Sequence, residues 1–259
     1  MKAILITGGG SGIGRAVAQL FASRGWRVGL ADRDAAALAE TVALLPADRT
    51  SRHVMDVRSP EDWAEVLAEF TQASGGRLDV LFNNAGVAVG GPFGAASLDD
   101  LDRAVDVNFK GVLYGARLAH PYLAATPGAC LLNTASAAGI YGTAGAAVYS
   151  ATKFAVRGLT EALDGEWAAD GIRVRSLMPG FIDTPLLTAA VGGSNRSVRE
   201  TVVEAGLEFT PVETVAEAAW AAVHGDRLHT LVGKTARRLA FASRWMPGTL
   251  RKRMRLGRG

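Results

Sequence analysis

The sequence contains very little cysteine, since Cys130 is the only one among its 259 residues. A single cysteine excludes an intramolecular disulfide, and its apolar neighbours indicate a small buried side chain. The sequence also lacks an apolar run long enough to cross a bilayer, and it does not open with a charged segment followed by an apolar one. We therefore expect a protein of a reducing compartment and place it in the cytoplasm.

Internal repeats, low-complexity tracts and long linkers rich in proline or serine are absent as well. We therefore expect one domain, residues 1–233, followed by a C-terminal extension, residues 234–259. The extension holds nine Lys or Arg and no acid, so the overall net charge of +3 leaves −6 for the first 233 residues. This acidic body excludes a uniformly basic nucleic-acid-binding domain, whereas the extension is compatible with peripheral contact with a membrane.

Short apolar segments alternate with longer amphipathic ones along the chain. Seven of them are rich in Val, Ile and Leu and are typical of buried strands: KAILIT, WRVGLA, RHVMDV, DVLFNN, CLLNTAS, RVRSLMPG and HTLVG. The intervening segments have apolar residues at a spacing of three to four, which predicts helices. Such alternation requires right-handed crossovers that place helices on both faces of a sheet. The sequence thus predicts an α/β fold, a doubly wound parallel seven-stranded sheet of the Rossmann type.

The first predicted strand runs into the glycine-rich segment TGGGSGIGRA. Gly8, Gly12 and Gly14 permit a tight turn, close approach to a pyrophosphate and close packing of helix on strand. The free N–H groups and the dipole of the following helix favour an anion there. Asp32 ends the second strand, and its carboxylate suits a ribose diol and repels the 2′-phosphate of NADP, a repulsion that Arg33 partly offsets. We therefore predict NAD rather than NADP as the cofactor.

Two further strand ends carry polar residues. Asp56 ends the third predicted strand, where its carboxylate is a candidate acceptor for the adenine amino group. Asn83 and Asn84 end the fourth strand in the segment NNAG. Their amides either hold the turn or contact the cofactor, and both interpretations stay open.

Tyr149 and Lys153 lie four residues apart in AVYSATKFAVRG, so on a helix they share one face. A phenol has a pKa of about 10, and an adjacent ammonium favours the phenolate, which brings proton exchange toward neutral pH. Ser136, which closes the fifth strand, offers a hydroxyl to hold a substrate oxygen. Each residue alone is common, and only their occurrence together points to proton chemistry.

The segments TGGGSGIG, NNAG, VNFKG, YSATK and PGFIDT, with Ser136 among them, occur in the order of the short-chain dehydrogenase/reductase family. The chain resembles this family over about residues 3–185, and its spacing of Ser136, Tyr149 and Lys153 is unlike that of the family's enoyl reductases. The resemblance implies that Tyr149 is the acid/base and that Ser136 orients the carbonyl. It further implies that Lys153 binds the nicotinamide ribose and that Asn108 helps to hold a water linking Lys153 to solvent.

The resemblance also places residues 179–184 beside the nicotinamide, with Ile182 and Thr184 offering groups to its carboxamide. We expect no metal site. The residues expected to bind the cofactor are Gly8, Gly10, Ser11, Gly12, Ile13, Gly14, Asp32, Arg33, Asp56, Val57, Asn83, Ala85, Gly86, Tyr149, Lys153, Pro179, Gly180, Ile182 and Thr184.

Residues from about 185 to 213 correspond to the family's substrate-binding loop. Two interpretations of their apolar side chains are equally favoured: they line a pocket for a lipophilic substrate, or they pack a lid onto the protein body. The apolar residues include Leu186, Leu187, Val191, Val198, Leu207 and Phe209. In the extension, apolar residues interleave with arginines, and Pro247 with Gly248 interrupts any single long helix. Such a surface could contact a membrane, another subunit or the entrance to the substrate pocket. The alternative is that the extension is a tail surrounded by solvent.

Together these features predict an NAD-dependent oxidoreductase that moves a hydride between nicotinamide and a secondary alcohol or ketone. A 3-oxoacyl thioester reductase is an alternative with the same residues, but we expect it to use NADPH, which Asp32 disfavours. A catalytically silent dinucleotide-binding scaffold is a third hypothesis, against which Ser136, Tyr149 and Lys153 argue together. The resemblance implies a homodimer or homotetramer, with residues 108–124 and 150–169 as candidate interfaces.

Overall fold

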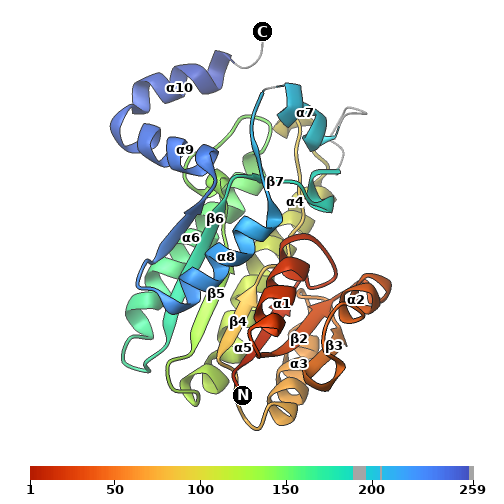
Figure 1. Cartoon of the computed structure of the whole chain (residues 1–259). Coiled ribbons are helices and arrows are strands. Elements are labelled where there is room, and N and C mark those ends of the chain that lie inside the picture. The colour runs from red at the N-terminus through yellow and green to blue at the C-terminus, as the bar shows by residue number, and fades with distance from the viewer. Residues whose placement is uncertain (189–196, 205, 257–259) are drawn as a thin grey trace.

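Seven parallel strands form one sheet in the order β3-β2-β1-β4-β5-β6-β9, with helices on both faces (Figure 1). The computed structural model describes residues 1–188, 197–204 and 206–256. The strands are β1 (Ala3–Thr7), β2 (Arg27–Asp32), β3 (Thr50–Val54), β4 (Val80–Asn83), β5 (Cys130–Thr134), β6 (Arg173–Pro179) and β9 (His229–Val232). The order reverses between β1 and β4, which is the doubly wound topology, so the predicted fold is confirmed.

Alternate residues of β1 enter two different cores. Ile4 packs in a cluster with side chains of α1 (Gly12–Ser23) and α8 (Val212–His224), and α2 (Ala35–Val42) lies on the same face. Leu5 packs in a cluster on the opposite face with α3 (Pro60–Ala73) and α5 (Gly111–Ala124). A strand buried on both faces reads as a continuous apolar run, which is why the strands were visible in the sequence.

Two features of the sheet differ from the sequence prediction. The third strand ends at Val54, so the prediction that Asp56 ends it was wrong. The N–H of Asp56 instead bonds to the Asp62 carboxylate at 2.8 Å, where the chain turns into α3. A second, two-stranded parallel sheet was not predicted and joins β7 (Phe181–Ile182) to β8 (Phe209–Thr210).

Several helices surround the carboxyl edge of the sheet. They are α4 (Leu98–Val105), the wide π-helical turn η3 (Asp106–Lys110), the short η4 (Ala137–Gly139), α6 (Ala147–Glu166), η5 (Pro185–Thr188) and α7 (Val198–Glu204). Within the predicted lid, Val191 lies outside the described residues. Leu187 is buried, whereas Leu207 is exposed on 39% of its surface.

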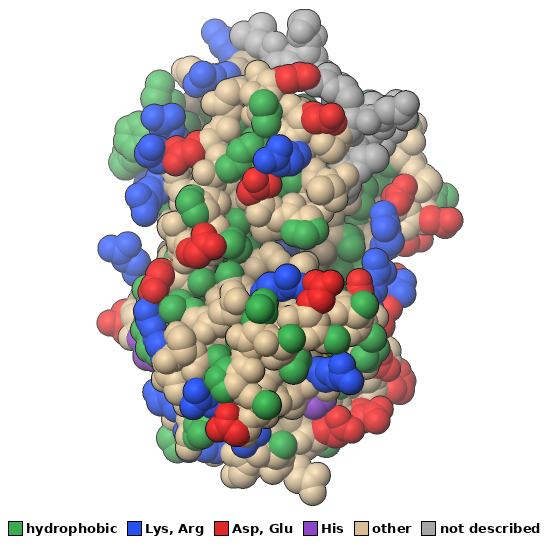
Figure 2. Space-filling view, turned by 45° about the vertical axis from the view of Figure 1, so that its right-hand side comes forward, with side chains coloured by type: hydrophobic (Ala, Val, Ile, Leu, Met, Phe, Trp, Pro, Cys, Tyr) green, Lys and Arg blue, Asp and Glu red, His purple; other side chains and the backbone are tan. Residues whose placement is uncertain are grey.

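The C-terminal extension forms two helices, α9 (Lys234–Trp245) and α10 (Pro247–Leu256), separated at the predicted break. They project from the body of the molecule at its upper left in Figure 1. Figure 2 shows hydrophobic and basic side chains next to each other at that edge. Over the residues described, the structure contains no helix with the length and apolar character needed to cross a membrane.

Candidate active site

The structure brings Ser136, Tyr149 and Lys153 together at the carboxyl end of β5. Ser136 follows that strand and opens η4, while Tyr149 and Lys153 lie in the first turns of α6. The two segments approach closely because residue 139 is glycine, where a Cβ would lie 2.7 Å from the Lys153 carbonyl oxygen. This close approach of η4 to α6 positions the serine against the tyrosine.

The Lys153 ammonium is held by the protein backbone. Its Nζ donates to the carbonyl oxygen of Thr134 at 2.8 Å and lies 5.7 Å from the centroid of the Tyr149 ring. The side chain is buried, and burial lowers the pKa of Lys153 from 10.5 to about 8 because the charged form loses its water. Lys153 is therefore mostly protonated at neutral pH and titrates in mildly basic solution.

Tyr149 keeps its proton more firmly than its spacing from Lys153 predicts. Burial raises the pKa of the Tyr149 phenol above its ordinary value of 10.0, and a hydrogen bond with Ser136 acts in the opposite direction with a smaller effect. The ammonium was expected to lower this pKa, but desolvation of the phenolate prevails. Tyr149 is thus a proton donor at neutral pH. The Ser136 hydroxyl also accepts a bond from the N–H of Ala138 at 3.1 Å.

Asn108 is fully buried in the wide turn η3. Its Oδ1 accepts from the N–H of Val87 at 2.8 Å, and its Nδ2 donates to the Val87 carbonyl at 2.9 Å. A Cβ at Gly86 would lie 3.1 Å from Asn108 Oδ1 and 3.8 Å from Lys153 Nζ, so these three residues are neighbours. The side chain therefore anchors the segment after β4, and a water held at this turn stays a prediction.

The glycine loop fits the pyrophosphate of a dinucleotide. Gly8 and Gly12 have φ angles of 67° and 51°, which favour glycine, and a Cβ at Gly14 would collide with the Gly8 carbonyl. The Ser11 side chain makes no capping bond to α1, and the first turn of α1 has no acidic residue. The amides at this helix start are therefore available for an anion, and the partly buried Ile13 packs behind them.

Asp32 lies directly beside this loop at the end of β2. Its Oδ2 accepts from the N–H of Gly10 at 3.0 Å, and a Cβ at Gly10 would lie 3.0 Å from the same oxygen. A carboxylate here fits the diol of a ribose whose phosphate rests on the loop. Arg33 is exposed, and its positive charge contributes to the lowered pKa of Asp56.

Asp56 and Val57 follow β3. The Asp56 carboxylate is bound by Arg58, whose Nε and Nη2 lie 2.9 and 2.6 Å from Oδ2, and this hydrogen-bonded partner holds the pKa of Asp56 below its usual range. Val57 is buried, and its carbonyl accepts from the Trp63 indole at 3.0 Å. Arg58 was not among the residues predicted from the sequence, although a basic residue two positions after the acid was a visible signal.

The two asparagines after β4 hold the protein's own structure. Asn83 is buried and donates to Asn133 Oδ1 at 3.1 Å. Asn84 donates to the Thr7 carbonyl at 3.0 Å, and the N–H of Ala85 donates to Thr7 Oγ1 at 3.1 Å. These bonds tie the ends of β4 and β1 together beside the glycine loop, and a contact of Asn83 with the cofactor stays a prediction.

The segment after β6 crosses the same edge of the sheet. Pro179 ends β6, Gly180 follows, and Ile182 is buried in the core cluster beneath α1. Thr184 lies over the glycine loop, because a Cβ at Gly12 would be 3.1 Å from Thr184 Cγ2. The structure therefore places this segment and the glycine loop in contact.

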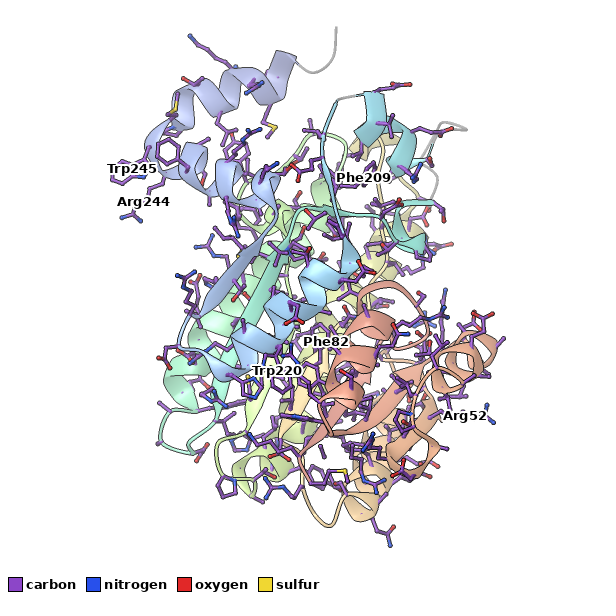
Figure 3. The ribbon with its side chains drawn as sticks, viewed as in Figure 1. Arg52, Phe82, Phe209, Trp220, Arg244 and Trp245 are labelled. Carbon is purple, nitrogen blue, oxygen red and sulfur yellow. The ribbon has the colours of Figure 1, made fainter. Side chains whose placement is uncertain are left out.

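A bidentate ion pair fastens α7 to the segment after β7. Arg199 Nε and Nη2 lie 3.0 and 2.9 Å from the Asp183 carboxylate oxygens. The Arg199 guanidinium also lies 5.4 Å from the ring centroid of Phe209, the residue that opens β8 (Figure 3). The described part of the lid is thus tied to both strands of the small sheet.

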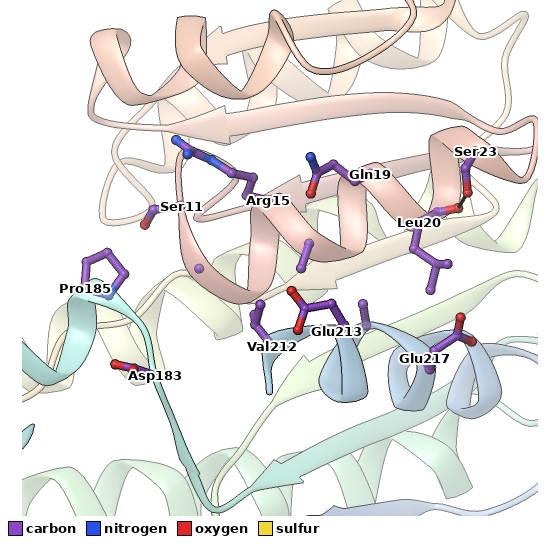
Figure 4. A pocket seen from close by; sticks show the side chains of 13 residues that line it. Ser11, Arg15, Gln19, Leu20, Ser23, Asp183, Pro185, Val212, Glu213 and Glu217 are labelled. Carbon is purple, nitrogen blue, oxygen red and sulfur yellow. Dashed lines mark hydrogen bonds between the residues drawn. The ribbon is translucent and has the colours of Figure 1, made fainter. Parts of the chain in front are cut away.

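A cavity of about 600 Å³ lies between α1 and α8 and reaches the glycine loop at Ser11 and Gly12 (Figure 4). Asp183 and Pro185 close it at that end, and Glu217 lies at the other. Asn108, Ser136, Tyr149 and Lys153 are not part of its lining. The cavity therefore adjoins the loop from outside the catalytic cluster.

Over the described residues no group of His, Cys, Asp or Glu is arranged to hold a metal ion.

Comparison with known proteins finds a matching family model and similar chains. The family model described as short chain dehydrogenase matches residues 2–193. The meso-2,3-butanediol dehydrogenase of Serratia marcescens is 39% identical over 183 residues, which are 71% of this chain and 72% of that protein.

Two solved structures have closely similar folds. A short chain dehydrogenase/reductase from Burkholderia phymatum in complex with NAD has a TM-score of 0.83 at 29% identity, covering 97% of this chain and 95% of that one. A short chain dehydrogenase from Burkholderia cenocepacia in complex with NADP has a TM-score of 0.82 at 23% identity, covering 98% and 99%. Structures of this fold therefore hold either dinucleotide.

Proposed function

Because this chain belongs to the short-chain dehydrogenase/reductase family and is an oxidoreductase acting on CH–OH groups, we propose that it interconverts a lipophilic secondary alcohol and its ketone with NAD. The observation that supports this most directly is the cluster at the end of β5. Ser136 is hydrogen-bonded to Tyr149, and Lys153 is buried beside the Tyr149 ring.

The glycine loop and Asp32 are the basis for proposing NAD. The amides at the start of α1 would bind the pyrophosphate, and the Asp32 carboxylate would accept bonds from the ribose hydroxyls. Its charge would repel a 2′-phosphate. Lys153 would bind the second ribose, and Ile182 and Thr184 would contact the carboxamide. When bound, the nicotinamide supplies or accepts the hydride.

Ser136, Tyr149 and Lys153 would act on the substrate oxygen. The Ser136 hydroxyl holds that oxygen against Tyr149. Tyr149, protonated at neutral pH because burial raises its pKa, gives its proton to the oxygen as a ketone is reduced and takes it back in the reverse direction. The positive charge of Lys153 stabilises the phenolate left behind, and Asn108 holds the η3 turn through which a water would resupply the proton.

The lid supports a lipophilic substrate. Within the lid, the side chains of Leu187 and Val202 are buried, and Phe209 in β8 is half buried. The meso-2,3-butanediol dehydrogenase relative carries an alcohol in its name, which is consistent with an alcohol substrate here. We also propose a homodimer or homotetramer, and a cytoplasmic location in which Cys130 stays reduced.

The test is Tyr149→Phe, assayed with NAD and NADH on a panel of secondary alcohols and ketones. We expect the variant to fold and bind NAD with unchanged affinity, and to lose turnover by about 10²- to 10⁴-fold, since general acid catalysis contributes that much. Tyr122→Phe, on α5 and away from the cluster, is the matched control and should retain turnover. If Tyr149→Phe keeps more than a tenth of the wild-type rate, the proposed mechanism fails.

A further inference from the structure

The outer face of α9 combines large hydrophobic side chains with arginines. Phe241, Trp245 and Met246 are 60%, 66% and 47% exposed. Phe241 and Trp245 are four residues apart and so lie on one face of the helix. Arg237 and Arg238 stand one turn before Phe241. The Arg244 guanidinium lies 5.4 Å from the ring centroid of Trp245 (Figure 3).

The inner faces of both helices are already occupied. Ala236 of α9 is fully buried, and Leu250 of α10 is only 6% exposed. Met254, four residues after Leu250, is half buried. The body of the protein therefore holds α9, which contacts β9 and η4, and α9 in turn holds α10. Phe241, Trp245 and Met246 form a second apolar surface that the described residues leave uncovered.

The charge of this surface has one sign. All eight basic residues between 234 and 256 are exposed: Lys234, Arg237, Arg238, Arg244, Arg251, Lys252, Arg253 and Arg255. Of these eight, only Lys234 forms an ion pair with another described residue, Glu208, at 3.3 Å. No acid occurs in residues 234–259. A partner for this surface must therefore bring both negative charge and an apolar layer.

We propose that α9 and α10 dock on the surface of an anionic lipid bilayer. Trp245 and Phe241 would enter the interface between headgroups and acyl chains, which is the preferred location of tryptophan. The basic residues of α10 would lie among the anionic headgroups. The helix pair projects from the body, so a flat and deformable surface fits it without a shaped pocket (Figure 1).

This docking would place the active site next to the membrane. The chain passes from β9 directly into α9, which packs against η4, the segment that Ser136 opens. A lipophilic substrate dissolved in the bilayer would then lie close to the catalytic cluster. This consequence rests on the proposed function, whereas the docking itself does not.

The test is binding of the full chain to vesicles, without cofactor or substrate. Vesicles of phosphatidylcholine mixed with phosphatidylglycerol should bind the protein at low salt and release it at high salt, and vesicles of phosphatidylcholine alone should not. Each positive charge removed should weaken binding about fivefold, or about 1 kcal/mol. Arg251→Gln with Arg253→Gln should therefore lose about 25-fold, whereas the matched pair Arg52→Gln with Arg227→Gln, exposed elsewhere, should lose less than twofold.

Trp245 gives a second readout, because Trp26, Trp63 and Trp167 are buried and Trp220 is half buried. Its fluorescence should shift to the blue on anionic vesicles. Trp245→Phe should abolish the shift and keep binding, whereas Trp245→Ser should weaken binding at least tenfold. Tyr149→Phe should bind vesicles normally, which separates this proposal from the proposed reaction.

Three outcomes would overturn the proposal. One is equal binding to neutral and anionic vesicles, and another is full binding by Trp245→Ser. The third is an oligomer of the wild-type chain, detected by sedimentation, that Trp245→Ser dissociates, together with no binding to vesicles. That result would assign the surface to contact with a second copy of the chain.

Discussion

The Nζ of Lys153 donates to the carbonyl oxygen of Thr134 at 2.8 Å, so the last residue of β5 holds the ammonium of α6. Among the described residues, the ammonium has this one hydrogen bond and the face of the Tyr149 ring at 5.7 Å, with no carboxylate partner, and burial lowers the pKa of Lys153 to about 8. A buried, weakly compensated ammonium destabilises the folded protein at every pH at which it is charged.

Protein stability should therefore rise with pH above 8. Below about pH 8, Lys153 is protonated in both the folded and the unfolded protein, and the free-energy cost of burying its charge is fully present. Between pH 8 and the pKa of 10.5 that Lys153 has in the unfolded chain, the unfolded chain binds more protons than the folded protein. Unfolding therefore becomes less favourable as the pH increases over this range. The full shift is worth roughly 3 kcal/mol. Two buried acids oppose this rise, because burial raises the pKa of the Cys130 thiol from 9.0 to about 12 and also raises that of Tyr149. Cys130 acts from about pH 9 and Tyr149 from about pH 10, so the rise is steepest between about pH 8 and 9.

The measurement is the free energy of unfolding from urea titrations at pH values from about 7.5 to about 9.5, the range in which Lys153 titrates. Lys153→Met, of similar length and without charge, is the control and should lack the rise. A wild-type profile that falls over this range, or one that the variant reproduces, contradicts the assigned pKa.

Gly139→Ala should impair catalysis without impairing cofactor binding. The added Cβ would lie 2.7 Å from the Lys153 carbonyl oxygen, and the backbone of α6 cannot yield, so η4 must move. Ser136 moves with it, and a misplacement of about 1 Å at a catalytic group costs on the order of 10²-fold in kcat. Gly142→Ala is the control, because a Cβ there meets nothing within 4 Å. Equal kcat values for the two variants would show that the approach of η4 to α6 is unimportant.

The sequence predicted the parallel sheet well because buried strands and amphipathic helices differ in period. It also predicted that Tyr149 and Lys153 share a helix face, since a spacing of four has only that outcome on a helix. Both inferences depend on residues that are close together in the sequence. The structure contains the elements that they predict, namely the strands of the large sheet and helix α6.

What the sequence did not predict depends on contacts across the fold. The bond from Lys153 to Thr134 joins residues 19 apart in different elements. The small sheet pairs strands of only two residues, too short for any periodic pattern. The sequence predicted that the pKa of Tyr149 is lowered, whereas burial raises it. The spacing reveals the neighbouring charge of Lys153 but not the loss of water that burial brings.

Asp32→Asn should reduce the preference for NAD over NADP. The asparagine keeps an oxygen to accept the bond from Gly10, so the glycine loop retains its support, but it no longer repels a 2′-phosphate. We expect the KM for NADP to fall on the order of tenfold, with a smaller change for NAD. Steady-state titration of both cofactors measures this. A wild-type protein that already prefers NADP would refute the role of Asp32.

Arg199→Ala should weaken substrate binding and leave the fold intact. Both side chains of the pair with Asp183 are about half exposed, so its loss should cost less than about 1 kcal/mol of stability. The pair nevertheless joins α7 to the segment beside β7, and its loss frees the lid on one side. We expect the KM for the alcohol to rise several-fold with kcat nearly unchanged, and wild type to approach the variant at high salt. Arg103→Ala breaks a similarly exposed pair with Asp100 on α4 and is the control. If Arg103→Ala raises KM as much as Arg199→Ala does, the lid is not held by this ion pair.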